Sequence, residues 1–217
     1  MSLQNDTSAP SKNSKTKDKI LKHALKLFSS KGYKATTVRD ISGSIGIKQS
    51  ALYNHFKNKD AILETLISNL TSSAIVTLFD DKDTQALQMQ GKALLLSLAT
   101  TFKLIGFDGQ NEALLRLLMQ EIYRNEHIRE IYNEYFYQEN VKKLSGVFFG
   151  MMQEDIIKSS DPLLLANEFF APLFFYQMQV SLLKLDKKST SSVVSMFEKH
   201  VDYFWDNIKI TKQETLF

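Results

Sequence analysis

The sequence contains no cysteine, only three prolines and only eight glycines in 217 residues. Without cysteine the chain can form no disulfide, no thiolate zinc site and no cysteine nucleophile, and this is consistent with a reducing cytoplasm, where we expect the protein to be located. With so few prolines and glycines, little interrupts regular backbone structure. Strand-like alternation of apolar and polar residues is also missing, so the sequence predicts an all-α protein.

Motifs that support catalysis or hold a cofactor are missing as well. The four histidines, His23, His55, His127 and His200, are far apart and form no metal-binding pair such as HxxxH. There is no G-x-S-x-G elbow and no glycine loop of the kind that cradles phosphates. We therefore expect no metal, no cofactor and no enzymatic activity. An active site assembled from distant residues remains the third interpretation.

Two segments could be mistaken for membrane or targeting signals. Residues 1–15 are polar and rich in Ser, Asn and Lys, so we expect a disordered basic arm rather than a leader peptide. Residues 162–183 are nearly all apolar over a membrane-spanning length, but Asn167, Glu168 and Gln177 interrupt them. A helix that is apolar on nearly all sides is instead expected to be buried on two sides.

Charge is unevenly distributed along the chain. Residues 1–63 carry twelve Lys and Arg against four Asp and Glu, a net charge of +8. The rest of the chain carries fifteen basic and twenty acidic residues, a net charge of −5. The overall charge of +3 is therefore the sum of a basic head, residues 1–63, and an acidic body, residues 64–217. This asymmetry indicates a polyanionic partner at the amino-terminal end.

Residues 36–63 predict two short helices joined by a glycine-containing turn, followed by the start of a third helix. Thr37 is a good N-cap, and Asp40 three residues later completes an approximate capping box. Gly46 can adopt the positive φ that a sharp turn needs. The second helix opens with outward side chains of the kind that read base edges or bind phosphate: Lys48, Gln49, Ser50, Tyr53, Asn54 and His55. This is the pattern of a helix-turn-helix, which makes DNA the first candidate partner.

A similar helix pair with a polar outer face also occurs in helical proteins that bind no DNA. The alternative function is therefore a helical module that binds a small molecule or a protein without binding DNA. Loss of the basic outer face would favour this alternative, and that face is present.

At these residues the sequence resembles the tetracycline-repressor (TetR) family. The resemblance rests on LFSSKGY (27–33), TTVRDIS (36–42), IGI (45–47) and ALYNHFKNKDAIL (51–63), which match the family pattern without a gap over about the first third of the chain. It implies an amino-terminal three-helix DNA-binding domain and a helical carboxy-terminal domain that dimerises and often binds a small ligand. Ser42 departs from the pattern, because the family most often has Ala there.

The resemblance also implies which residues contact DNA. By position these are Thr37, Lys48, Gln49, Ser50, Tyr53, Asn54, His55 and Lys59. Tyr53 and Lys59 resemble the family's phosphate contacts. Lys48, Gln49 and Asn54 fall where sequence-reading side chains vary among members; Lys favours guanine acceptors, and Gln and Asn suit adenine.

The predicted organisation is a disordered basic arm (1–15), a DNA-binding domain (16–62) and a ligand-binding and dimerisation domain (63–217). The first helix is expected over 16–31. Its buried stripe is Ile20, Leu21, Ala24, Leu25, Leu27 and Phe28. Further helices are expected at about 59–79, 84–106, 109–124, 126–155, 161–186 and 189–209, with a turn at 80–83.

The helices near 161–186 and 189–209 are the expected subunit contact. The first is apolar nearly all round, and the second has a broad aromatic face formed by Val193, Val194, Phe197, Val201, Phe204, Trp205 and Ile208. Together they are suited to a four-helix interface in a two-fold homodimer. A large monomeric core is the alternative.

Most aromatic and methionine side chains lie in the body, where they are compatible with a pliable apolar cavity or with plain core. The candidate ligand-binding residues are Phe102, Phe107, Met119, Tyr123, Tyr132, Phe136, Phe148, Met151, Met152, Phe170, Phe174, Gln177 and Met178. The expected effector is a small, largely apolar or aromatic molecule, and the acidic body also suits a cation. The expected function is a ligand-responsive transcriptional repressor that binds a palindromic operator as a homodimer.

Overall fold

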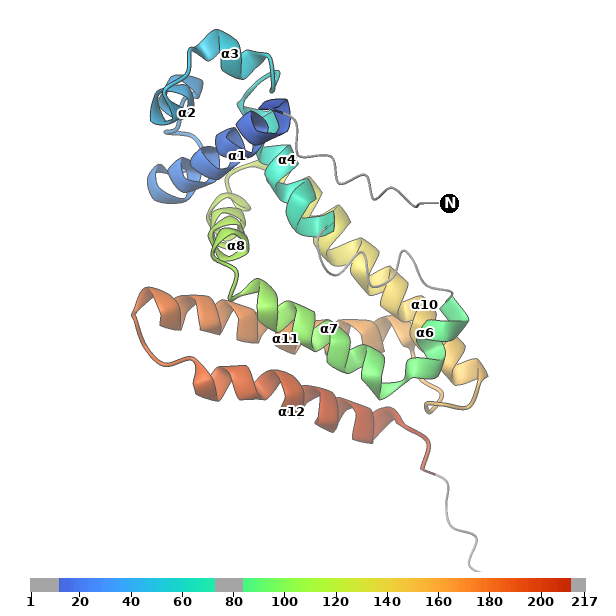
Figure 1. The fold of residues 1–217 in the computed structure, drawn as a ribbon. Helices are drawn as coiled ribbons and strands as arrows, with labels where there is room; N and C mark the ends of the chain where they lie inside the picture. Colours follow the sequence, from blue (N-terminus) through green and yellow to red (C-terminus); the bar gives the residue numbers. More distant parts are fainter. Residues whose placement is uncertain (1–11, 73–83, 212–217) are drawn as a thin grey trace, which may run out of the picture. The chain divides into compact units, whose positions relative to one another are not determined.

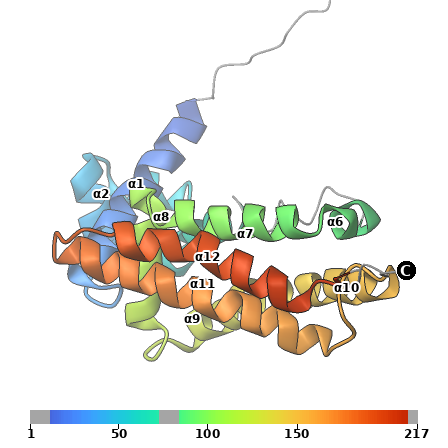
Figure 2. The same cartoon turned by 90° about the horizontal axis from the view of Figure 1, so that it is seen from below.

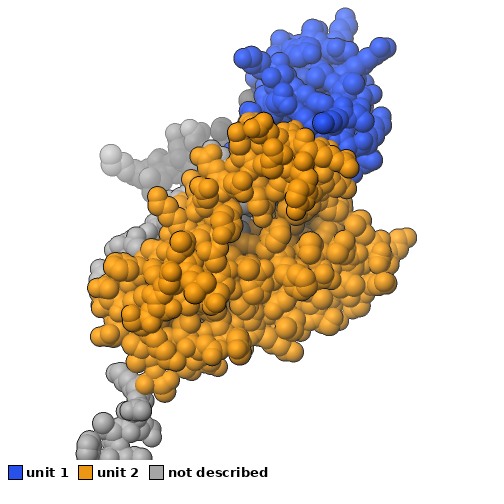
Figure 3. All heavy atoms as spheres, turned by 180° about the vertical axis from the view of Figure 1, so that it is seen from behind, with its two compact units in different colours: residues 1–68 blue, residues 69–217 orange. Residues whose placement is uncertain are grey.

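The computed structural model describes residues 12–72 and 84–211 (Figure 1). The described residues are mainly helical, and outside the helices only an isolated bridge pairs Ile157 with Lys209. The predicted all-α fold is therefore confirmed. The chain divides into two compact units, residues 1–68 and 69–217, which Figure 3 colours separately. This division falls inside helix α4 rather than at the predicted 62–63 boundary, because buried residues of α4 continue to Ile67.

The described helices of the first unit are α1 (Lys12–Lys31), α2 (Val38–Ile45), α3 (Gln49–Tyr53) and the first part of α4 (Lys59–Ser72), up to Ser68. Helix α1 begins at Lys12, so the prediction of a disordered arm was wrong for residues 12–15, which are helical. Residues 1–11, the predicted continuation of α4 to Phe79 and the predicted turn at 80–83 lie outside the described residues.

The apolar stripe of α1 forms much of the core of the first unit. Ile20, Leu21, Ala24, Leu25 and Phe28 are all buried, as predicted, whereas Leu27 is only half-buried. Burying an apolar side chain of this size stabilises the fold by about 1.5–3 kcal/mol. This stripe therefore fixes the helices against which the DNA-binding candidates are placed.

The described helices of the second unit are α6 (Thr84–Gln90), α7 (Lys92–Ile105), α8 (Gly109–Glu121), α9 (Glu126–Ile131), the π-helix η1 (Tyr132–Gln138), α10 (Glu139–Gln153), α11 (Pro162–Leu185) and α12 (Ser191–Ile208). Two predicted helices differ from this arrangement. The helix expected at 84–106 is broken at Gly91, and the helix expected at 126–155 changes to π form over 132–138.

Gly91 explains the break between α6 and α7. Its backbone has φ 52° and ψ −122°, a conformation that side-chain-bearing residues rarely adopt. An added Cβ would also lie 3.0 Å from Cη2 of Trp205 on α12. Periodicity in the sequence gave no sign of this contact, because Trp205 is far from Gly91 along the chain.

Helix α11 is the centre of the second unit and contacts α7, α10 and α12 (Figures 1 and 2). Its start is as predicted: the Asp161 carboxylate accepts hydrogen bonds from the amides of Leu163 and Leu164, and Pro162 occupies the first turn. One face of α11 is buried, as Phe169 and Leu173 show, but the opposite face is exposed in the single chain. No helix among the described residues is both long and apolar enough to cross a membrane.

Candidate nucleic-acid interface and ligand cavity

The predicted capping box at the start of α2 is present. The amide of Asp40 donates to Oγ1 of Thr37 at 3.1 Å, and the amide of Thr37 donates to Oδ2 of Asp40 at 2.9 Å. The Thr37 hydrogen bonds, together with the nearby charges of Lys31 and Arg39, lower the pKa of the Asp40 carboxyl. The box therefore fixes the start of α2 with a carboxylate that is ionised at neutral pH.

The turn between α2 and α3 also follows the prediction. Gly46 has φ 74°, and its amide donates to the carbonyl of Gly43 at 3.2 Å. Ser42, where the resembled family most often has Ala, is buried and its hydroxyl donates to the carbonyl of Arg39 at 3.1 Å. The added hydroxyl is thus satisfied inside the turn of its own helix.

Helix α3 is short, and its α form covers only Gln49–Tyr53. Leu52 and Phe56 face inward and are buried, and the amide of Phe56 still donates to the carbonyl of Leu52 at 3.1 Å. The outward residues Lys48, Gln49, Ser50, Tyr53 and Asn54 are exposed, and His55 is half-buried. The short helix therefore presents a row of hydrogen-bonding side chains to solvent.

Lys59 joins the start of α4 to the loop that follows α1. Its Nζ donates to the carbonyls of Tyr33 at 2.7 Å and Thr36 at 2.9 Å, and lies 4.2 Å from the centroid of the Tyr33 ring. The Tyr33 hydroxyl donates to Oδ1 of Asp60. Asn58 caps α4, because its Oδ1 accepts from the amide of Ala61 at 2.8 Å. Lys59 is therefore a positioning residue of the fold, and its predicted phosphate contact stays a prediction.

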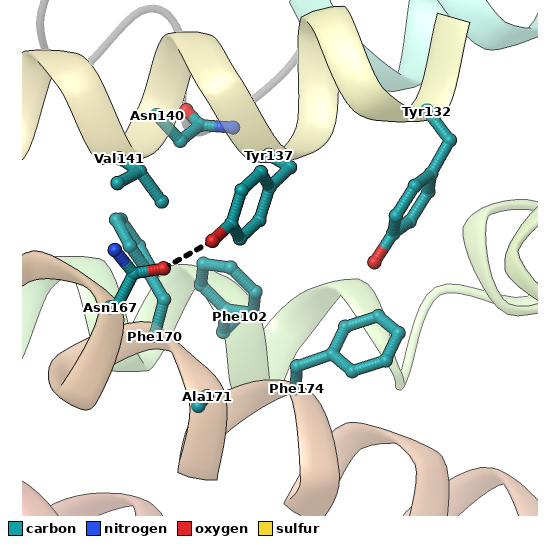
Figure 4. Close-up of a pocket in the computed structure, with 9 residues that line it drawn as sticks. All are labelled: Phe102, Tyr132, Tyr137, Asn140, Val141, Asn167, Phe170, Ala171 and Phe174. Carbon is teal, nitrogen blue, oxygen red and sulfur yellow. Dashed lines mark hydrogen bonds between the residues drawn. The ribbon is translucent and has the colours of Figure 1, made fainter. Parts of the chain in front are cut away.

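The second unit contains an apolar cavity of about 250 Å³ between η1, α7, α10 and α11 (Figure 4). Four of the predicted ligand-binding residues line it together: Phe102, Tyr132, Phe170 and Phe174. The other lining residues were not among the predicted ligand-binding residues, and Asn167 was noted only as an interruption of the apolar segment 162–183: Tyr137, Asn140, Val141, Asn167 and Ala171. Asn140 and Asn167 could have been found only as polar side chains on otherwise apolar helix faces.

A second cavity of about 440 Å³ lies between α8 and α11. The predicted residues Met119, Tyr123 and Met178 line it, and Phe174 borders both cavities. Arg116 also lines it, but its guanidinium pairs with Oε1 of Glu112 at 2.7 Å. The positive charge of Arg116 on this wall is therefore already balanced by the Glu112 carboxylate.

The remaining predicted ligand-binding residues line neither of these two cavities. Phe148, Met151 and Met152 belong to the core, where the Phe148 and Phe204 ring centroids are 5.9 Å apart. Phe107 is 46% exposed, with Lys184 Nζ 4.4 Å from its ring centroid. The side chain of Phe136 lies outside the described residues.

Gln177 forms hydrogen bonds with backbone atoms and lines neither of these two cavities. It is buried, and with its amide nitrogen facing the carbonyl of Phe102 it donates there at 2.5 Å. Its Oε1 then accepts from the amide of Gly106 at 2.8 Å. A Cβ at Gly106 would lie 2.7 Å from the Gln177 amide, so this glycine permits the contact between α11 and the end of α7.

Among the described residues, no three His, Asp or Glu side chains are grouped in a way that could hold a metal ion. His200 is buried instead in the core of the second unit, where its Nε2 lies 3.0 Å from the carbonyl oxygen of Phe169. Burial lowers the pKa of His200, against a smaller opposing effect of that hydrogen bond. His200 is therefore a core histidine.

Residues 20–66 match the family "Bacterial regulatory proteins, tetR family". Over 53 residues the chain is 49% identical to the Staphylococcus epidermidis "Biofilm operon icaADBC HTH-type negative transcriptional regulator IcaR". This match covers 24% of this chain and only 29% of that relative. A longer match, 29% identical over 196 residues, is to "Probable HTH-type transcriptional regulator YttP" of Bacillus subtilis, covering 88% of this chain and 86% of that protein.

The fold of both units is also found among solved structures. The "SmeT-Triclosan complex" is one of them, with a TM-score of 0.69 and 16% sequence identity over 94% of each chain. At this identity the likeness concerns the fold alone. Residues 20–66, which include the helix-turn-helix, are therefore a domain of the tetR family, and the likeness to solved structures extends the shared fold to both units.

Proposed function

We propose that this protein is a transcriptional repressor that binds a palindromic operator as a homodimer and responds to a small ligand. The observation that carries the proposal is the capped and anchored helix-turn-helix, whose short α3 leaves Lys48, Gln49 and Asn54 exposed. The +8 charge of residues 1–63 supports a polyanionic partner.

In the proposed complex, α3 of each subunit enters a major groove. For a two-fold dimer the half-sites lie about 34–36 Å apart, or a multiple of this distance, along one face of the DNA. Thr37, Tyr53 and Lys59 fix the register on phosphates, while side chains of α3 read base edges. Because Lys59 is already held by two backbone carbonyls, it would present a fixed charge at little further entropic cost.

We assign the subunit contact to the outer faces of α11 and α12. The exposed face of α11 carries an apolar stripe at helical spacing: Leu164, Ala171, Phe175, Met178, Leu182 and Leu185. On α12, Met196 and Tyr203 are exposed at 38% and 73%. A two-fold contact would remove both faces from water in a four-helix arrangement.

Ligand binding would weaken operator binding only if the ligand prefers the conformation that does not fit DNA. The two cavities of the second unit are the candidate sites. If the alternative function holds, the protein is a helical module that binds a small molecule or a protein, and it binds no DNA duplex.

A mobility-shift titration against the DNA upstream of the protein's own gene tests the proposal. Gln49→Ala and Asn54→Ala should each weaken specific binding by about 1–3 kcal/mol, the discrimination that a good bidentate base contact provides. Asn69→Ala, which truncates an exposed amide on α4, is the matched control. Affinity should also fall steeply as salt rises, because phosphate contacts release counterions. Unchanged affinity in both α3 variants would contradict the assignment of α3 to base reading.

A further inference from the structure

The cavity between η1, α7, α10 and α11 owes its shape to the π-helical segment. In η1 hydrogen bonds close at five residues, as the bond from the Glu139 amide to the Glu134 carbonyl shows. Residues five apart then lie nearly above one another, whereas in an α-helix they point about 140° apart. Tyr132 and Tyr137 are five apart, so the π form brings both rings to one cavity (Figure 4).

The cavity has a defined polar end. The Tyr137 hydroxyl donates to Oδ1 of Asn167 at 2.5 Å, and Nδ2 of Asn167 donates to the carbonyl of Leu163 at 2.8 Å. A phenolic oxygen can still accept, and the amide nitrogen carries a second proton. This pair therefore presents one acceptor and one donor, which together match a hydroxyl group.

The polar end lies at the rim, and the aromatic wall lies deeper. Tyr137 is 49% exposed, whereas Phe170 and Val141 are 8% and 4% exposed. The Phe102 and Phe170 ring centroids are 5.5 Å apart, and those of Tyr132 and Phe174 are 6.3 Å apart in an edge-to-face arrangement. These are distances at which a further ring can pack against rings.

Among the described residues that line this cavity, no side chain has a formal charge at neutral pH. Burial also raises the pKa of the Tyr132 phenol, so this group stays neutral. An ion in the cavity would lose hydration without a partner of opposite charge. A cation would recover part of this loss from the ring faces, but these rings already pack against each other. The lining thus favours a neutral ligand, although the unit as a whole is acidic.

We propose that this cavity binds a small neutral aromatic molecule of one or two rings with a hydroxyl group. Its rings lie against Phe102, Phe170 and Phe174, and its hydroxyl reaches Tyr137 and Asn167. The volume of about 250 Å³ is below the roughly 300–1,000 Å³ of sites for larger drug-sized ligands. The inference rests on the proposed function only for the effect of the ligand on DNA, because binding to the cavity is a property of the second unit.

Calorimetric titration of the full-length protein with four ring-matched probes tests the proposal. The probes are 2-naphthol, 2-methoxynaphthalene, 2-naphthoate and 2-naphthylmethylammonium. We expect 2-naphthol to bind at one site per chain, the methoxy compound about fivefold more weakly through loss of the donated hydrogen bond, and both ions at least about tenfold more weakly. Absence of 2-naphthol binding, or tighter binding of either ion, would overturn the proposal.

Two variants assign the binding to this cavity. Tyr137→Phe should lower the affinity for 2-naphthol about fivefold and leave 2-methoxynaphthalene unaffected, a difference that general unfolding cannot produce. Ala171→Trp fills the cavity from α11 and should abolish binding of both. Because Ala171 also lies on the α11 stripe assigned to the subunit contact, sedimentation of this variant separates filling of the cavity from loss of the dimer. Met119→Ala, in the second cavity, is the control and should change nothing. If Met119→Ala lowered the affinity while Ala171→Trp did not, the site assignment would be wrong.

Failure of this inference and failure of the proposed function have different signatures. The titrations contain no DNA, and the mobility-shift experiment contains no probe. A protein that binds its operator but none of the probes would refute the ligand class alone. A protein that binds 2-naphthol but no duplex would refute DNA recognition and leave the cavity assignment standing.

Discussion

At the residue scale, Lys59 shows how one side chain can serve the fold and the proposed interface together. Its ammonium group is held by the Tyr33 and Thr36 carbonyls, and by the face of the Tyr33 ring. These contacts connect the end of α1, the start of α2 and the start of α4. Substituting Lys59 would therefore disturb the geometry of the helix-turn-helix as well as remove a charge, so loss of DNA binding in such a variant would not by itself identify a phosphate contact.

His200 gives a prediction for pH dependence. Burial among Phe169, Tyr176 and Phe204 lowers its pKa, so the folded protein holds it neutral where the unfolded chain would take up a proton. The stability it contributes is fully present above the unfolded pKa of about 6.5 and is lost as pH falls towards the lowered folded pKa. The free energy of unfolding should therefore decrease from pH 7.5 to pH 5.5.

Chemical denaturation at both pH values checks this prediction. In His200→Gln the decrease between pH 7.5 and 5.5 should be smaller than in wild type. His127→Gln, which removes an imidazole from an exposed position on α9, is the matched control. An equal decrease in wild type and His200→Gln would show that His200 does not govern this pH dependence.

At the scale of helices, Gly91 decides where α6 ends and α7 begins. Gly91→Ala would force a side chain into φ 52° and place its Cβ against Trp205, so we expect a loss of about 1–3 kcal/mol in the free energy of unfolding. Trp205 is the single tryptophan, so its fluorescence should report the local displacement.

Gly146 on α10 provides the control for this prediction. An added Cβ there would meet nothing within 4 Å, and its position is helical and exposed. Gly146→Ala should therefore stabilise the protein by about 0.5–1 kcal/mol through higher helix propensity. If both variants changed stability equally, the special role of Gly91 would be refuted.

At the scale of the whole molecule, the apolar outer face of α11 predicts the oligomeric state. Phe175 is 52% exposed near the middle of this stripe. Phe175→Glu would place a carboxylate on each side of a two-fold contact, where desolvation and like charge oppose association. We expect sedimentation at micromolar concentration to show a dimer for wild type and a monomer for this variant.

Leu104→Glu is the corresponding control for the dimer. Leu104 lies on α7 and is 59% exposed, so the substitution adds the same charge at an exposed apolar position outside the proposed interface. It should leave the dimer intact. A Phe175→Glu protein that remained dimeric would place the subunit contact elsewhere.

The sequence by itself determined features that depend on neighbouring residues. The cap at Thr37, the positive φ of Gly46, the start of α11 at Asp161 and the buried stripe of α1 all follow from spacing and local hydrogen bonding. The family and the all-α fold were predicted for the same reason, because their signals lie in continuous segments.

Only the tertiary structure decided which side chains of the second unit share a cavity. Phe148 and Phe170 looked alike in the sequence, yet Phe148 fills the core while Phe170 also borders a cavity. The break at Gly91 depends on Trp205, and the position of Tyr137 depends on a π form that helical periodicity does not reveal. These features arise from contacts between helices that are distant in the chain, and an apolar side chain packs equally well against core or cavity until those neighbours are in place.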